Sequence, residues 1–144
     1  MYFGHPINVY GTELEKRLLE VINGFLKTLS LRDSCEWVVE NPNQPCHQEG
    51  YKDWATKTGK GMDYYYHCVL PGCVAGIFLP FRDGKWGAGV FGEAKCITRH
   101  SNIVWEITHD EKIARIECIC DIPALSVEET RKRIRDAAGQ PLPF

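Results

Sequence analysis

The chain has 144 residues, of which 44% are hydrophobic and 25% charged, and its formal net charge is −2. This length predicts a single domain over residues 1–144, large enough to bury a core without disulfides or a structural metal. The balanced charge favours neither nucleic acid nor an anionic surface, and no apolar run is long enough to span a membrane. We therefore expect neither nucleic-acid nor membrane partners.

The first predicted element is a helix from Glu13 to Leu29. Thr12 and Glu15 have the T-x-x-E spacing of a capping box, and apolar residues then recur at helical spacing. Cys35 to Glu40 reads as a short strand. Residues 41–61 are rich in turn-forming residues and predict a long loop.

Three consecutive antiparallel strands are predicted in the middle of the chain, at 63–70, 73–81 and 86–91. The runs are rich in β-branched and aromatic residues. Pro71-Gly72 is suited to the centre of a type II turn, and Asp83-Gly84 is a strong signal for a two-residue hairpin loop. Together these turns predict a meander with two distinct faces.

The predicted meander continues through strands at 93–99, 103–108 and 114–122. On the last pair, Glu106 is expected opposite Arg115. Ser126 and Glu129 then form a second capping box, which predicts a C-terminal helix ending near residue 139, with 139–144 as a flexible tail. The expected fold is α+β: a helix, six or seven antiparallel strands curled into a half-barrel, and a closing helix.

One face of the predicted meander carries three glycines beside aromatic rings and one histidine. Glycines within strands often mark the close approach of a ligand, although a helix packed closely over them, or bends in a curved sheet, would explain them as well. We therefore predict a shallow ligand site floored by glycine and walled by aromatic rings, with Trp54 from the long loop as a lid residue or, alternatively, as an anchor of that loop. The candidate ligand-binding residues are Trp54, Tyr65, His67, Gly76, Phe78, Gly87, Gly89 and Phe91.

No recognised catalytic, metal-binding or cofactor-binding motif is present in the sequence. The seven cysteines include no C-x-x-C pair, so no metal site is predicted, and reduced thiols in the cytoplasm are expected. The basic run at 131–135 is interpreted as a solvated helix face. His67 is the candidate general base, and its carboxylate partner is left open among Asp63, Glu93, Glu49 and Asp53.

Three functions are compatible with these patterns. The first is a non-catalytic domain that binds a small, partly apolar ligand on the glycine face. The second is a protein-interaction protein, an adaptor or toxin-neutralising partner, acting as a homodimer or in a complex. The third is a small enzyme that uses His67.

Overall fold

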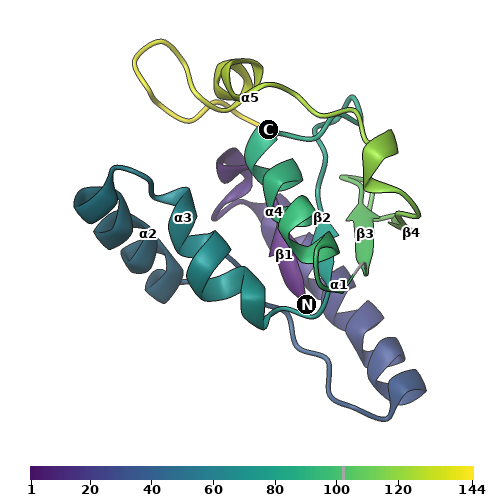
Figure 1. The fold of residues 1–144 in the computed structure, drawn as a ribbon. Coiled ribbons are helices and arrows are strands. Elements are labelled where there is room, and N and C mark those ends of the chain that lie inside the picture. Colours follow the sequence, from purple (N-terminus) through teal and green to yellow (C-terminus); the bar gives the residue numbers. More distant parts are fainter. Residues whose placement is uncertain (102) are drawn as a thin grey trace.

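The computed structural model describes residues 1–101 and 103–144. Over these residues the protein has an α+β fold with five helices, four short helical turns and one open, mixed sheet of four strands (Figure 1). The helices are α1 (Glu13–Asp33), α2 (Pro45–Thr58), α3 (Met62–Tyr64), α4 (Ala88–Thr98) and α5 (Val127–Ile134). The strands are β1 (Tyr2–Gly4), β2 (Gly76–Phe78), β3 (Val104–Ile107) and β4 (Ile113–Arg115). The short turns are η1 (Ile7–Val9), η2 (Tyr65–Val69), η3 (Leu70–Gly72) and η4 (Ile119–Asp121).

The sheet has the order β1-β2-β3-β4, with the first three strands parallel and β4 antiparallel to β3. On its other side, β1 is bridged by Glu40, which pairs with Tyr2 in parallel. After α1 the chain therefore passes along one side of β1 at Glu40, and after η3 it forms β2 on the other side of β1. Such a reversal beside one strand leaves a crevice at its carboxyl end, where ligands of parallel sheets commonly bind.

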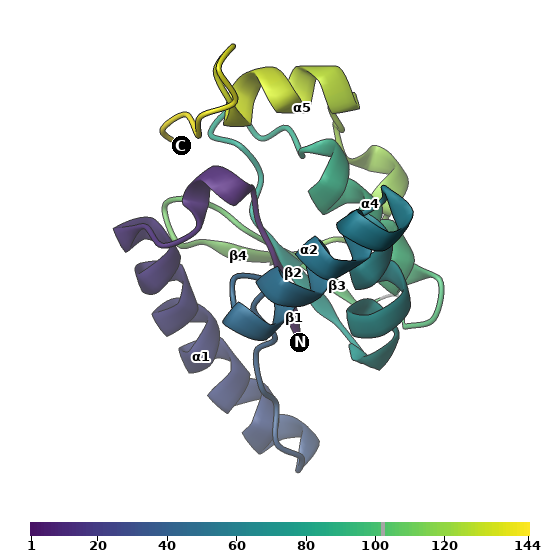
Figure 2. The same ribbon diagram turned by 90° about the vertical axis from the view of Figure 1, so that its left-hand side faces the viewer.

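Helices cover both faces of the sheet (Figure 2). On one face α1 buries Leu18, Ile22 and Leu26 against strand residues that include Ile77. On the other face, η2 and α4 pack around Phe78. The antiparallel half-barrel expected from the sequence is wrong, because the sheet is largely parallel, open and smaller.

The central meander is the main difference between expectation and structure. Residues 63–70 form α3 and η2 rather than a strand, and η3 replaces the expected type II turn at Pro71-Gly72. Residues 88–98 form α4, which takes up most of the strands expected at 86–91 and 93–99. The residues that favour strands in these two segments are aromatic and aliphatic, and such side chains pack equally well from a helix that lies on a sheet. Tertiary packing therefore overrides their local preference for strands.

Only the middle of the predicted 73–81 strand is extended, at β2. The turn at Asp83-Gly84 does form, with φ +79° at Gly84 and a hydrogen bond from Phe81 N–H to the Lys85 carbonyl (2.9 Å). It does not close a hairpin, since the chain runs on into α4. The β3–β4 pair is antiparallel, but Trp105 rather than Glu106 lies opposite Arg115.

Two further segments differ from expectation. The predicted loop at 41–61 contains α2, a helix of 14 residues. The segment 139–144, predicted to be a flexible tail, contacts the body of the protein: Leu142 N–H donates to the Ile134 carbonyl (3.0 Å), and the ring of Phe144 stacks on Phe81.

Candidate functional site

A cavity of about 1290 Å³ lies at the carboxyl end of β1. Its walls come from the segment after β1, from α2, α3 and η2, from the first turns of α4, and from α5 with the residues that follow it. In Figure 1 this is the end of the sheet nearest α5. Its lining includes His5, Tyr10, Tyr51, Tyr65, Tyr66, Gly87, Gly89, Glu93 and Arg131.

His5 is fixed by two hydrogen bonds directly after β1. Its Nδ1 lies 3.0 Å from the Phe3 carbonyl oxygen, and its Nε2 lies 3.2 Å from Glu15 Oε1. Both ring nitrogens are thus engaged with oxygen atoms of the protein. The ring also stacks on Phe3, with 4.2 Å between centroids, so its orientation is set by the end of the strand.

Glu15 lies beneath His5 and joins three segments of the chain. Its carboxylate accepts hydrogen bonds from Gly11 N–H (2.5 Å), Asn41 Nδ2 (2.9 Å) and Asn43 Nδ2 (2.9 Å), in addition to the contact with His5. Burial acts to raise the pKa of Glu15, but the hydrogen bonds from His5, Asn41 and Gly11 outweigh it and lower the pKa to about 2. Glu15 is therefore a buried, ionised anchor.

Glu93 is the buried carboxyl group that lines the cavity. It is only 7% exposed, and the nearby polar group that acts on its carboxyl is the Tyr2 hydroxyl. Space for its carboxyl exists because residue 4 is glycine: a Cβ there would lie 3.0 Å from Glu93 Oε2 and would clash with the ring of Phe78. Burial raises the pKa of Glu93 to about 8, and the nearby Tyr2 hydroxyl opposes this only partly.

Three phenols, those of Tyr10, Tyr65 and Tyr66, line the cavity together with Glu93. Burial, followed by the negative charge of Glu93, raises the pKa of Tyr66 to about 12 and also raises that of Tyr2, Tyr10 and Tyr65. All four hydroxyls are therefore neutral at physiological pH. The Tyr2 hydroxyl is buried without a hydrogen-bond partner in the described part of the chain.

The first turn of α4 forms the floor between the tyrosines and α5. Gly87 precedes the helix, and the N–H of Ala88 donates to Thr130 Oγ1 of α5 (2.9 Å). A Cβ at Gly87 would lie 3.2 Å from Thr130 Cγ2, so glycine permits this close approach of α4 and α5. At Gly89 a Cβ would meet only Met62 Cε at 4.0 Å, so Gly89 faces open space.

The eight candidate residues from the sequence separate into three groups. Tyr65, Gly87 and Gly89 line the cavity. Gly76 and Phe78 lie fully buried in β2 beneath α4. Trp54 and His67 stack on each other outside the cavity, with 6.3 Å between ring centroids, and Phe91 lies under Lys95 on α4.

The expected glycine-floored sheet face does not exist, because Tyr65 and His67 lie on a helical turn. The explanation that a helix packs over the glycine applies to Gly76, where a Cβ would lie 2.8 Å from Ile97 Cδ1 of α4.

Sequence reasoning missed the polar residues after β1 and gave Glu93 only a supporting role. Two signals were available. Val90, Ala94 and Ile97 follow helical spacing, which places Glu93 one turn after the glycines. The buried run at 1–4 followed by His5 also has the form of a parallel strand that ends at a polar site.

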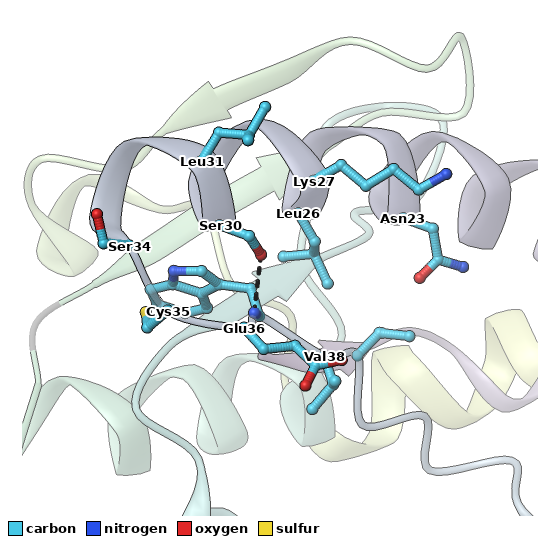
Figure 3. Close-up of a pocket in the computed structure, with 11 residues that line it drawn as sticks. Asn23, Leu26, Lys27, Ser30, Leu31, Ser34, Cys35, Glu36 and Val38 are labelled. Atoms are coloured by element: carbon cyan, nitrogen blue, oxygen red, sulfur yellow. Dashed lines mark hydrogen bonds between the residues drawn. The ribbon is translucent and has the colours of Figure 1, made fainter.

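A second hollow lies between the C-terminal half of α1 and residues 34–39 (Figure 3). Ser30 Oγ accepts a hydrogen bond from Trp37 N–H across it (2.9 Å). Its charged residues are Lys27 and Glu36. Because it holds no buried ionisable group, we take the cavity at Glu93 as the candidate site.

The described residues contain neither a membrane-spanning helix nor a cluster of metal ligands. No helix there combines the length and the apolar character needed to cross a bilayer. No group of three or more His, Cys, Asp or Glu residues there is placed to hold a metal ion. Comparison of the chain with protein-family models, curated proteins and solved structures gave no match.

Proposed function

We propose that the protein binds a small, ring-bearing molecule in the cavity at the carboxyl end of β1, and that the protonation state of Glu93 responds to the bound ligand. The observation that carries this proposal is a buried carboxyl group, with its pKa raised to about 8, in the wall of a cavity rich in aromatic rings. Burial of an ionisable group without a partner lowers stability, and such groups are concentrated at functional sites.

The proton chemistry follows from the protonation state. At neutral pH, Glu93 is mostly protonated and can donate a hydrogen bond or a proton to a ligand atom. Because its pKa is close to neutrality, the same group can also take a proton back. The proposed proton-exchanging group is therefore Glu93 rather than His67, which is exposed and stacks on Trp54 outside the cavity.

A substitution that fills the cavity with a side chain tests whether a ligand binds there. A leucine at position 89 has room and improves the helix, so Gly89→Leu should fold and occupy the ligand space. Thermal-shift measurements with nicotinamide, purine and related soluble heterocycles should show stabilisation of the wild type, about 2.7 kcal/mol at a hundred times Kd. Gly89→Leu should lose this stabilisation.

Gly24→Leu is the matched control, because Gly24 is an exposed helical glycine on α1 with nothing within 4 Å of an added Cβ. It should respond to ligands as the wild type does. Equal ligand-induced shifts in both leucine variants would show that the ligands bind elsewhere.

A second candidate function is binding to another protein, favoured by the second hollow between α1 and residues 34–39. Leu31 is 86% exposed and Val38 61% exposed, and both line that hollow. Light scattering of the wild type against Leu31→Lys tests it: a loss of mass on substitution would support self-association, whereas a monomer in both cases would remove it.

A further inference from the structure

The Glu93 end of the cavity contains a carboxyl group without a counter-ion. The phenols that line the cavity with it are Tyr10, which follows η1, and Tyr65 and Tyr66 of η2, and the Tyr2 hydroxyl of β1 lies near its carboxyl. Among the described residues, no lysine or arginine forms an ion pair with Glu93. A carboxylate in such a place is unstable unless a cation accompanies it.

The basic groups around the cavity are engaged or remote from this end. His5 uses both ring nitrogens on Phe3 and Glu15. Lys132 pairs with Glu128, and Arg135 donates to the Gly139 carbonyl. The remaining charged residues, Arg131 and Asp136, lie with them on the exposed α5 side.

We propose that the Glu93 end of the cavity binds a small organic cation, whose protonated or quaternary nitrogen lies beside the carboxylate among the rings of Tyr10, Tyr65 and Tyr66. This inference rests on the proposed function and names the class of ligand. Electron-rich ring faces attract cations, and aromatic cages of this kind recognise ammonium groups. The cation supplies the charge that the buried carboxylate lacks.

Binding of such a cation is coupled to one proton. In the free protein Glu93 carries its proton; in the complex it is ionised, and that proton passes to the solvent. A ligand of fixed charge should therefore bind about fifty-fold more tightly at pH 8 than at pH 6, given a free-state pKa of about 8. A neutral ligand that accepts a hydrogen bond from protonated Glu93 should instead weaken as the pH rises through 8.

The experiment compares two matched pairs by calorimetry at pH 6, 8 and 9: 1-methylnicotinamide with nicotinamide, and benzyltrimethylammonium with benzyl alcohol. None of these compounds titrates in this range. We expect at least one cation to bind at pH 8 at least tenfold more tightly than its neutral partner. Repetition in buffers of different ionisation enthalpy should show release of about one proton on binding at pH 6 and about half a proton at pH 8.

Variants identify the source of the proton. Glu93→Gln has the shape of the protonated side chain, so it should fold, and it should abolish both the proton release and the preference for cations. Glu20→Gln, which removes an exposed carboxylate on α1, should change neither. Arginine and lysine do not titrate between pH 6 and 9, so a pH dependence that survives in Glu93→Gln would show that a group other than Glu93 is responsible and would overturn the proposal.

The outcomes separate this inference from the proposed function. Binding of the neutral compounds with equal or greater affinity would overturn the cation assignment while leaving the cavity as a ligand site. Absence of binding by all four compounds up to 10 mM (about −2.7 kcal/mol) would count against both proposals.

Discussion

A carboxyl group buried among phenols makes folding depend on pH in an unusual direction. The folded-state pKa of Glu93 is raised to about 8 from an ordinary value of 4.5. Between these values the folded protein holds a proton that the unfolded chain has lost. The contribution of Glu93 to stability is therefore fully present below about pH 4.5 and is lost as the pH rises through 8.

The corresponding prediction concerns Glu93→Gln. The amide cannot ionise, so the variant should lose less stability than the wild type between pH 5 and 8, with a difference in slope approaching 1.4 kcal/mol per pH unit. Urea unfolding at several pH values measures this slope. Parallel stability curves for the two proteins would show that Glu93 is not protonated in the folded state.

At the scale of residues, the sequence predicted part of the candidate site for an incorrect reason. Tyr65, Gly87 and Gly89 were selected as neighbours on one sheet face, but they meet because η2 and α4 converge at the end of β1. Glu93 could not be ranked above Glu49 or Asp53, since burial of a carboxyl group is a property of the tertiary structure. No spacing in the sequence reports it.

Among the helices, α1 and α2 differ most in how they are held. Five residues of α1 are buried, whereas α2 buries none and packs chiefly on α3. A hydrogen bond of 2.6 Å between His47 Nε2 and Glu40 Oε1 ties α2 to the sheet edge. Helices with few buried contacts open most readily.

Hydrogen exchange should therefore be faster in α2 than in α1. His47→Ala removes the tie to Glu40 and should accelerate exchange in α2 further. Lys57→Ala, which removes only an exposed pair with Asp53 in the same helix, should have little effect. Equal protection of the two helices in the wild type would contradict this account.

Some secondary-structure elements could be predicted from the sequence and others could not. The caps at Thr12 and Ser126 and the antiparallel pair of β3 with β4 are local features, and the structure contains them. The helix α4 was hidden because its residues, AGVFGEAKCIT, are apolar or small on nearly every side. Such runs fit a buried helix and a strand alike, and only the neighbouring elements decide between them.

At the scale of the whole molecule, one sheet is shared by two hydrophobic cores. Ile22 of α1 and Ile97 of α4 are both fully buried, on opposite faces. Truncating either to alanine should cost about 2–5 kcal/mol. Because both cores depend on the same strands, unfolding should remain a single transition in both variants.

Denaturant unfolding, monitored by tryptophan fluorescence and by circular dichroism, tests whether unfolding is a single transition. The two probes should give coincident curves with unchanged m-values for Ile22→Ala and Ile97→Ala. Separate transitions in either variant would show that the two faces fold independently.

The position of His5 is set by residues that no ligand in the cavity would touch. Asn41 and Asn43, which do not line the cavity, donate hydrogen bonds to the Glu15 carboxylate that also contacts His5. Substitutions at these asparagines would therefore alter the cavity wall at His5 from outside the cavity. An alanine scan restricted to the cavity lining would overlook this supporting layer of residues.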